Sequence, residues 1–315
     1  MPKVMVTGVN GFVGKHLTRE LSARECEVVG VGQDTSPSPL IADSLQSYYA
    51  CDLTNADEVD KLKLDDIDAV ISLAGLARVG DSFKNPDRYM QVNVKVLSVL
   101  GEKIIAEDLS PRVIAISTGA VYDSQQTMPL TEESKTVEGG SPYVQSKIKM
   151  EAAAQDLSRR GLDCVIVRPF NHTGPGQETG FLVPDLYQKI VELKPAGNTL
   201  TAGNIDTKRD YTDVRDVVKA YTELALAPSL DHGLYNVCSG KSLSGRDILG
   251  WVQKAVGTNL RVEKDESLMR PNDPQEIYGS YERLQKDTGW APSIPISKTV
   301  DDFVQNKDEP GLMAA

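Results

Sequence analysis

The sequence predicts an α/β fold: a doubly wound parallel sheet that carries a smaller carboxy-terminal lobe. Through the first half of the 315-residue chain, short apolar runs alternate with longer helical patterns. The runs are rich in β-branched residues and apolar at nearly every position, as strands covered on both faces are. In the second half, prolines and glycines cluster at 169–184, 195–203 and 271–279, which favours a lobe of loops and helices that lies on the sheet.

Each element is expected from its own local pattern. The first-half strands are expected at Lys3–Thr7, Glu27–Gly32, Ala69–Leu73, Arg112–Ser117 and Asp163–Arg168. The first-half helices are expected at Gly11–Arg24, Ala56–Lys61, Pro86–Glu107 and Pro142–Arg160. The second half is expected to contain a strand at Leu234–Cys238 and helices at Arg215–Ala225 and Ser244–Val256, and the tail after Asn306 is expected to fray.

Composition excludes several classes of partner. The formal net charge is −11, which would repel phosphate backbones and anionic lipids, so we expect neither nucleic acid nor a membrane as a partner. The amino terminus enters a strand without the apolar stretch of a signal peptide, and the expected location is the cytoplasm. The four cysteines lack Cys-x-x-Cys spacing, and Cys164 and Cys238, inside apolar runs, are expected to be buried thiols.

A glycine-rich turn joins the first strand to the first helix. Gly8, Gly11 and Gly14 are spaced three apart, and the helix that they open is amphipathic, with Phe12 and Val13 near its start. Glycines allow a tight turn and let backbone N–H groups approach a pyrophosphate at the helix N-terminus. Because the pattern directly follows the first strand, it predicts a dinucleotide site in preference to a plain strand–helix turn.

Two acids after the next strands are candidates for the adenosine end of such a site. Asp34 lies twenty residues after Gly14, about the spacing of the acid that binds ribose hydroxyls, although it stands slightly beyond the expected strand end. Asp52, followed by Leu53, comes after the next short strand. A hydrogen bond to adenine and a place in a helix N-cap region are equally consistent with that position.

The basic residues around this region bear on the choice of cofactor. No Lys or Arg occurs between Glu27 and Asp60, so a 2′-phosphate would need a cation from elsewhere, such as Arg78 or Lys15. Local electrostatics therefore favour NAD over NADP.

The stretch 141–147 predicts a proton-transfer pair. Ser141 is suited to cap a helix whose first residue is Pro142, which places Tyr143 and Lys147 at i and i+4 on one face. A nearby ammonium favours a phenolate and is expected to lower the tyrosine pKa, which suits proton exchange at a sugar hydroxyl or ketone. The pair alone is also consistent with an exposed tyrosine beside a solvated lysine.

The strand that precedes this helix strengthens the catalytic interpretation. Ser117 and Thr118 stand at the carboxyl end of a predicted parallel strand, where α/β sheets bind ligands. Thr118 is therefore expected to hold the reacting sugar oxygen against Tyr143. The alternative is that the two hydroxyl residues only terminate the strand.

Together these motifs resemble the extended short-chain dehydrogenase/reductase superfamily. The motifs that carry the resemblance are Thr7-Gly8-x-x-Gly11-x-x-Gly14, Asp52-Leu53, Leu73-Ala74-Gly75, Asn93, Ser117-Thr118, Tyr143-x-x-x-Lys147 and Arg168-Pro169. The resemblance implies a Rossmann-type domain at residues 1–170, joined by about 204–240, that binds NADP or NAD, and a mainly substrate-binding lobe at residues 171–315. The cofactor-binding residues that it implies are Gly8, Asn10, Gly11, Phe12, Val13, Gly14, Asp34, Asp52, Leu53, Leu73, Ala74, Gly75, Asn93, Tyr143, Lys147, Arg168, Phe170 and His172.

Later stretches look like GDP-4-keto-6-deoxy-mannose reductases within this superfamily. These stretches are 168–177, Gly203-Asn204-x-x-x-x-Arg209, 210–217, 235–240 and Arg270-Pro271-x-Asp273. By resemblance, a nucleotide sugar, with a GDP-sugar favoured, would contact Thr118, Gly119, Asn171, Arg209, Arg270 and Asp273. Arginine is suited to phosphate, but Arg209 is also consistent with surface ion pairing. His172 is consistent with either the nicotinamide pocket or a structural loop role.

Several chemistries are disfavoured. Sugar 4,6-dehydratases carry an Asp-Glu pair after the catalytic threonine, whereas Gly119-Ala120 follow Thr118 here. No His/Cys/Asp cluster has metal-ligand spacing, and the three histidines are isolated in sequence, so we expect no metal and no hydrolase triad. Ketone reduction at C4, with Thr118, Tyr143 and Lys147 as catalytic residues, is the leading hypothesis. The alternatives are 4-epimerisation and, less favoured, a cofactor-sensing regulator; a homodimer is expected by resemblance.

Overall fold

The computed structural model describes residues 1–193, 199–265 and 273–306. Its largest unit is a seven-stranded, wholly parallel sheet with the strand order β10-β6-β5-β4-β1-β2-β3. The strands of this sheet are β1 (Lys3–Thr7), β2 (Glu27–Gly32), β3 (Ser47–Ala50), β4 (Ala69–Ser72), β5 (Arg112–Ile116), β6 (Cys164–Pro169) and β10 (Leu234–Val237). The predicted doubly wound α/β class is confirmed, and each predicted strand agrees with the structure to within a residue at either end.

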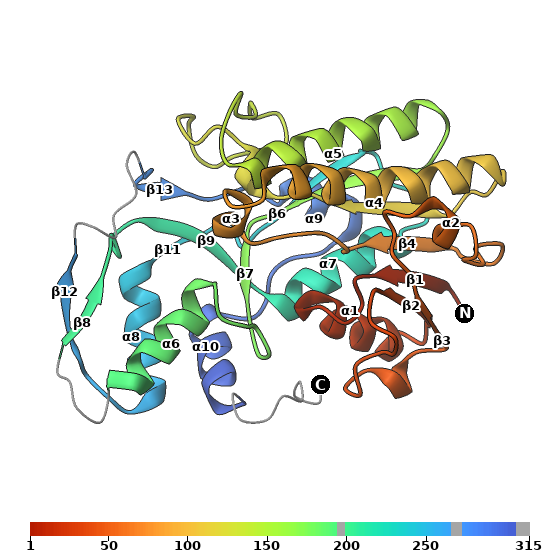
Figure 1. The fold of residues 1–315 in the computed structure, drawn as a ribbon. Helices are drawn as coiled ribbons and strands as arrows, with labels where there is room; N and C mark the ends of the chain where they lie inside the picture. Colours follow the sequence, from red (N-terminus) through yellow and green to blue (C-terminus); the bar gives the residue numbers. More distant parts are fainter. Residues whose placement is uncertain (194–198, 266–272, 307–315) are drawn as a thin grey trace.

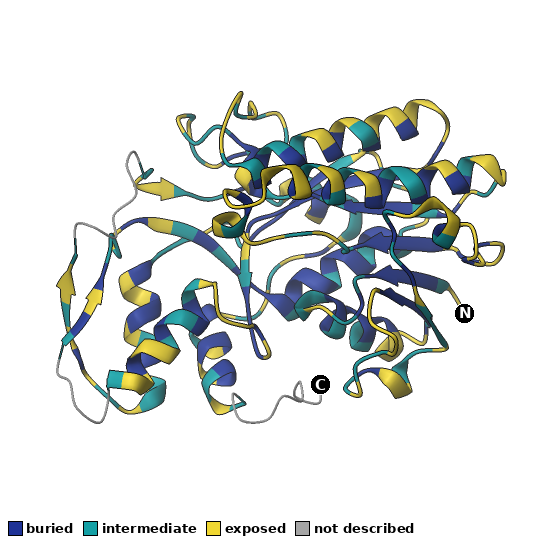
Figure 2. Ribbon diagram, viewed as in Figure 1, coloured by how far each residue is buried: buried dark blue, intermediate teal, exposed yellow. Residues whose placement is uncertain are grey.

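Helices cover both faces of this sheet (Figure 1). On one face lie α4 (Pro86–Ala106) and α5 (Pro142–Arg159), and on the other lie α1 (Phe12–Ala23) and α7 (Val214–Leu226). Two separate apolar cores result, one under each helix pair, and the strands between them are almost wholly buried, except the edge strand β3 (Figure 2). This double covering explains why the strands are apolar throughout. Shorter elements in this half are α2 (Ala56–Val59), α3 (Val79–Ser82) and the 3-10 turns η1 (Ala42–Ser44) and η2 (Gly119–Val121).

A second lobe packs beside the carboxyl ends of the strands, around its own apolar core (Figure 1). Its helices are α6 (Leu182–Leu193), α8 (Gly245–Val256) and α10 (Ile296–Gln305), while α9 (Glu282–Thr288) packs against β10. The lobe also contains two small sheets, so the expectation of only loops and helices there was wrong. Their strands are β7 (Asn171–Thr173), β8 (Thr199–Ala202), β9 (Lys208–Asp213), β11 (Ser242–Ser244), β12 (Arg261–Lys264) and β13 (Glu276–Ile277).

These small strands were not predicted from the sequence because they are short and mostly polar. β9 reads Lys-Arg-Asp-Tyr-Thr-Asp, without an alternation of apolar and polar residues, and the strands that pair with it come from distant segments of the chain. The predicted frayed tail lies outside the described residues. Within the residues that the structure describes, no helix combines the length and apolarity needed to cross a bilayer.

Among the described glycines, those in the turn after β1 leave the least room between their Cα atoms and neighbouring backbone atoms. Gly8 has φ +67°, and a Cβ there would stand 2.9 Å from the Ala74 nitrogen. A Cβ on Gly14 would stand 2.5 Å from the carbonyl oxygens of Gly8 and Val9. Since the obstructing atoms are backbone, only glycine lets α1 begin so close to the end of β1.

We therefore expect Gly14→Ala to lower the free energy of unfolding by about 2 kcal/mol or more, because a methyl group there forces the backbone apart. Urea unfolding of the ligand-free protein measures this. The matched control is Gly250→Ala on α8, where a Cβ meets nothing within 4 Å and a neutral or slightly stabilising effect is expected. Equal stability of Gly14→Ala and the parent would contradict the packing argument.

Candidate active site

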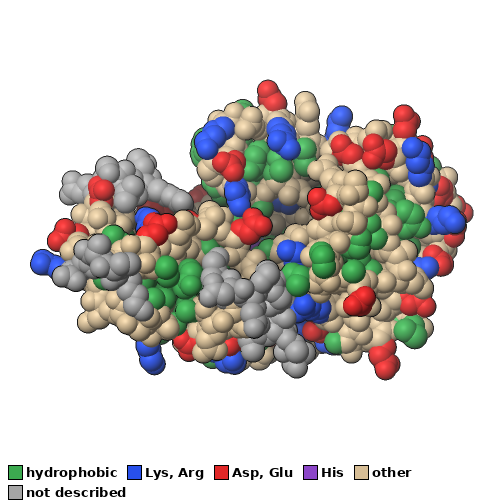
Figure 3. All heavy atoms as spheres, turned by 60° about the horizontal axis from the view of Figure 1, so that its bottom comes forward, with side chains coloured by type: hydrophobic (Ala, Val, Ile, Leu, Met, Phe, Trp, Pro, Cys, Tyr) green, Lys and Arg blue, Asp and Glu red, His purple; other side chains and the backbone are tan. Residues whose placement is uncertain are grey.

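The candidate site lies where the carboxyl ends of β1, β4, β5 and β6 meet. Strand order reverses between β1 and β4, and such a switch point opens a crevice at the carboxyl edge of a parallel sheet. The surface is hollowed between the sheet and the second lobe, with cationic and anionic side chains at the rim (Figure 3). Loops after these strands carry the residues predicted from the sequence.

The glycine loop fits the pyrophosphate of a dinucleotide. Gly11 is the N-cap of α1 and has no side chain to occupy the first-turn N–H groups, and the first turn holds no acid. The absence of Cβ atoms at Gly8 and Gly14 leaves the backbone exposed to a close ligand. A helix N-terminus of this kind is an anion site, so the donor set suits a diphosphate.

The adenosine side of the loop is cross-linked by Asn10. Its amide nitrogen donates to the Asp34 carboxylate at 2.7 Å, and its amide oxygen accepts from the Ser38 backbone N–H at 2.8 Å. The Tyr48 hydroxyl donates to the Asp34 carbonyl oxygen. Asp34 therefore lies beside the glycine loop, as its spacing predicted, with an exposed carboxylate.

Asp52 is engaged locally. Its carboxylate accepts from the backbone N–H and hydroxyl of Thr54, and these bonds hold its pKa below the usual range. The N-cap of α2 is Asn55. Asp52 thus forms the turn before the helix cap, while Leu53 beside it is buried.

Hydrogen bonds tie the loop after β4 to β1 and to α4, which in turn bonds to α5. Thr7 accepts from the Ala74 N–H at 3.1 Å, and a Cβ on Gly75 would meet the amide oxygen of Asn93 at 2.9 Å. Buried Asn93 accepts from the Leu76 N–H and donates to the Leu76 carbonyl oxygen and to Ser146. The side chain of Asn93 therefore fastens the loop that contains Leu73, Ala74 and Gly75.

Tyr143 and Lys147 are brought together as predicted, on the first two turns of α5. Ser141 caps this helix by accepting from the Val144 N–H, and Pro142 is its first residue. The Tyr143 phenol forms a hydrogen bond with Thr118, and Tyr89 packs edge-on against the Tyr143 ring. Both members of the pair are buried, so the interpretation as an exposed tyrosine beside a solvated lysine was wrong.

Burial sets the protonation of the pair. It raises the pKa of Tyr143, and the hydrogen bond from Thr118 opposes this only in part. Burial lowers the pKa of Lys147 to about 8. The expected lowering of the tyrosine pKa was therefore wrong: the Lys147 ammonium donates at 2.7 Å to the Ile116 carbonyl oxygen, and the ring has lost its contact with water.

Thr118 has two roles at the end of β5. Its side chain caps the η2 turn by accepting from the Ala120 N–H at 3.2 Å, and it also bonds to Tyr143. Gly119 follows directly, and a Cβ there would overlap the Phe170 ring. Both hypotheses for Thr118 are thus compatible with the structure, because the hydroxyl that ends the strand also faces the tyrosine.

Two predicted cofactor residues at the end of β6 face different surroundings. Arg168 is buried, and its guanidinium binds both carboxylate oxygens of Glu151, at 2.9 and 2.6 Å. His172 stacks on Phe12 with ring planes 6° apart, and burial lowers its pKa. His172 thus lies beside the start of α1 through Phe12, while Arg168 is engaged with Glu151 of α5.

Three of the predicted substrate residues, Asn171, Arg209 and Asp273, lie on the second-lobe side. Asn171 is exposed on β7, which pairs with β9. Arg209 on β9 donates to the Asp273 carboxylate at 2.5 Å and to the Pro274 carbonyl oxygen at 2.9 Å. Two predicted substrate ligands are therefore paired with each other, and Arg270 lies outside the described residues.

Sequence reasoning missed several groups around Tyr143 and Lys147, and one on α1. Glu151, Ser146 and Tyr89 are buried beside Lys147 and Tyr143, and His16 on α1 contacts the Pro175 carbonyl oxygen. A signal was present for Glu151, which continues the i, i+4 row of Tyr143 and Lys147. The other contacts join segments far apart in sequence, where no local pattern exists.

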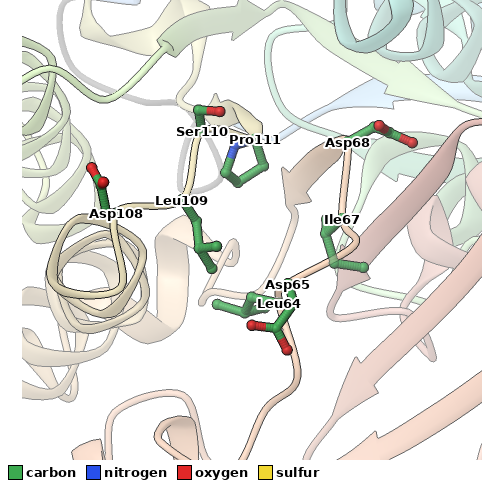
Figure 4. Close-up of a pocket in the computed structure, with 8 residues that line it drawn as sticks. All are labelled: Leu64, Asp65, Ile67, Asp68, Asp108, Leu109, Ser110 and Pro111. Atoms are coloured by element: carbon green, nitrogen blue, oxygen red, sulfur yellow. The ribbon is translucent and has the colours of Figure 1, made fainter.

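A separate pocket of about 250 Å³ lies at the opposite edge of the sheet (Figure 4). Its lining comes from the segments that precede β4 and β5, and includes the carboxylates of Asp65, Asp68 and Asp108. Because strands are parallel, this edge is the far one from the glycine loop. Three carboxylates also disfavour a diphosphate, so the dinucleotide site is not there. Among the described residues, no group of three or more His, Cys, Asp or Glu is arranged to hold a metal ion.

This fold and this arrangement of residues define an oxidoreductase of the extended short-chain dehydrogenase/reductase type. The model of the NAD dependent epimerase/dehydratase family matches residues 4–238. The chain belongs to that family, whose members use NAD or NADP, and the expected enzyme class is confirmed.

Individual relatives include both reductases and epimerases. The chain is 32% identical over 307 residues to the GDP-6-deoxy-D-mannose reductase of Pseudomonas aeruginosa, with 95% of this chain and 94% of that enzyme covered. It is 26% identical to a UDP-glucose 4-epimerase of Pisum sativum, over 95% of this chain and 94% of that enzyme. The structure of RMD from Pseudomonas aeruginosa with NADPH superposes with a TM-score of 0.83 at 30% identity, covering 97% of this chain and 98% of that one. A Thermus thermophilus UDP-glucose 4-epimerase with NAD gives 0.82 at 27% identity, with 98% and 99% covered.

We expect Tyr143→Phe to lower turnover by a factor of about 10² to 10⁴, because the variant keeps the ring but loses the transferable proton. Cofactor affinity, measured by quenching of protein fluorescence, should stay within a few-fold of the parent. The control is Tyr89→Phe, which loses a hydroxyl that, within the described part of the chain, bonds only to the Arg78 carbonyl oxygen. Unchanged turnover in Tyr143→Phe would refute the role of the phenol.

The pH dependence of kcat/KM should report the loss of the proton from Lys147. Its ammonium is the form that favours a phenolate nearby, and its pKa of about 8 means that this form is lost as the pH rises through about 8. We therefore expect kcat/KM, which reports the free enzyme, to fall on the alkaline side with a midpoint near pH 8. A flat profile to pH 10 would contradict this assignment.

Proposed function

We propose that the protein reduces the C4 ketone of a nucleotide-activated 4-keto-6-deoxy sugar, most specifically GDP-4-keto-6-deoxy-D-mannose. The observation that carries the proposal is the pairing of Thr118 with Tyr143 above a buried Lys147, at the strand ends beside the glycine loop. The similarity to a GDP-6-deoxy-D-mannose reductase supports the substrate. Gly119 and Ala120, which stand where a dehydratase carries acids, support reduction over dehydration.

The three catalytic residues have distinct parts. Thr118 and Tyr143 bind the C4 oxygen through their hydroxyl groups and fix its position. Tyr143 gives its proton to that oxygen as negative charge develops on it, and the raised pKa of the phenol ensures that the proton is present beforehand. The Lys147 ammonium stabilises the phenolate that remains.

A nicotinamide dinucleotide, when bound, supplies the hydride for this reduction. Gly8, Gly11 and Gly14 would hold its pyrophosphate, and Asn10, Phe12, Val13 and Asp34 would flank that group. The exposed Asp34 carboxylate and the lack of Lys or Arg between residues 27 and 60 favour NAD(H) over NADP(H). The NADPH complex of RMD shows that a relative can bind the other cofactor, so both belong in the assay.

The second lobe would bind the nucleotide portion. We assign residues 1–170 with about 204–240 to the cofactor, and 171–315 mainly to the substrate. Arg209 and Asp273 separate in this proposal, so that Arg209 binds a phosphate oxygen in place of the carboxylate. Asn171 and Arg270 are proposed as further substrate ligands from the resemblance alone. We also propose a homodimer and a cytoplasmic location.

The test is to incubate the enzyme with GDP-4-keto-6-deoxy-D-mannose and either NADH or NADPH. We expect one equivalent of reduced cofactor to be consumed for each GDP-6-deoxyhexose formed, and more rapidly with NADH. Absorbance at the nicotinamide band and chromatography of the nucleotide sugars measure both quantities. Interconversion of UDP-glucose and UDP-galactose without net consumption of cofactor would instead establish the epimerase alternative and overturn the reductase proposal.

A further inference from the structure

A buried ion pair lies directly behind the catalytic helix. Glu151 on α5 and Arg168 on β6 have side chains only 6% and 7% exposed, and the guanidinium binds both carboxylate oxygens. The Ser117 hydroxyl donates to the same carboxylate, and the Arg168 guanidinium lies over the Tyr122 ring at 4.6 Å. The pair thus joins α5, the end of β5 and the end of β6.

The same pair adjoins Lys147 through both helix and strand. Glu151 follows Lys147 by four residues on α5, so the two side chains occupy one face. The Lys147 ammonium donates to the Ile116 carbonyl oxygen, and Ile116 directly precedes Ser117, which bonds to Glu151. One carboxylate therefore fixes the strand end that receives the ammonium, and also supplies negative charge beside it.

We propose that Glu151 is a positioning residue for Lys147: its carboxylate, held in place by Arg168, keeps the Lys147 ammonium charged and directed at the end of β5. A buried pair of this kind adds little to stability compared with apolar replacements.

The surroundings of Lys147 support this assignment. Burial lowers the pKa of Lys147, and Glu151 is the charged group that opposes the lowering. The α4 side presents the neutral Asn93 amide, and the loop after β4 presents the Gly75 backbone. Among the described residues, the other titratable or charged groups around this cluster are Tyr143 from α5, Tyr89 from α4, Arg168 from β6 and Tyr122 after η2.

The experiment compares Glu151→Gln with Arg168→Gln, each as the full chain. We expect Glu151→Gln to move the alkaline midpoint of kcat/KM downward by about 1 in pH, because a neutral amide no longer favours the ammonium. Arg168→Gln leaves the carboxylate beside Lys147, so its midpoint should not move downward. A purely structural pair would affect both variants alike, so an equal downward movement in the two variants would overturn the proposal. It would also be overturned if Glu151→Gln moved neither the rate midpoint nor the labelling midpoint of Lys147 described next.

A second readout requires no substrate. Labelling of Lys147 by a small acylating reagent over a range of pH, read by mass spectrometry after digestion, gives the midpoint of the lysine directly. The inference rests on the role of Lys147 in the proposed function. This readout distinguishes a failure of the inference from a failure of that function. If labelling shifts as expected but the rate profile does not, then Glu151 positions Lys147 and the catalytic assignment of Lys147 is wrong.

The matched control is Glu102→Gln, which removes the carboxylate of an exposed Arg–Glu pair between α4 and α5. Its labelling and rate midpoints should equal those of the parent. If Glu151→Gln does not fold, the double variant Glu151→Gln/Arg168→Met leaves no buried unpaired charge. Its midpoint should also fall, and an unchanged midpoint there would overturn the proposal.

Discussion

Removal of an ammonium group from water costs several kcal/mol, yet this fold buries the ammonium of Lys147. Three features make the burial tolerable: the Ile116 carbonyl oxygen accepts a hydrogen bond from the ammonium, Glu151 supplies opposite charge, and the pKa of Lys147 falls to about 8. Each of these depends on α5 lying against the ends of β5 and β6. The position of one charged nitrogen thus links the sheet, the helix and the chemistry.

The glycine turn imposes the complementary constraint on the other side of the crevice. Because Gly8 and Gly14 carry no Cβ, α1 begins almost in contact with the end of β1, and its N-terminal N–H groups face the switch point. Asn10 then ties this turn to the segment that contains Asp34. An anion-binding helix end and a buried proton-transfer pair therefore open onto one crevice, which is the arrangement that hydride transfer to a bound ketone requires.

The sheet and the Tyr143–Lys147 pair could be predicted from the sequence because both depend on local patterns. Continuous apolar runs indicated doubly covered strands, and Ser141-Pro142 fixed where α5 begins, so Tyr143 and Lys147 were correctly placed on one face. The small strands β7 and β9 were missed because their partners lie far away in the chain. The tyrosine pKa was wrongly predicted because its direction depends on burial, which spacing does not reveal. Likewise, the contact between Arg168 and Glu151 joins different elements, and no local pattern revealed it.

The central claim is that the crevice delivers hydride to C4 of a keto sugar while Tyr143 protonates the oxygen there. Its most direct test is to supply reduced cofactor that is deuterated at the transferable position of the nicotinamide, together with GDP-4-keto-6-deoxy-D-mannose, and to examine the product by NMR. We predict one deuterium per molecule, bonded to C4 of the 6-deoxyhexose. A reduced product with no deuterium at C4, or deuterium at another carbon, would contradict the account.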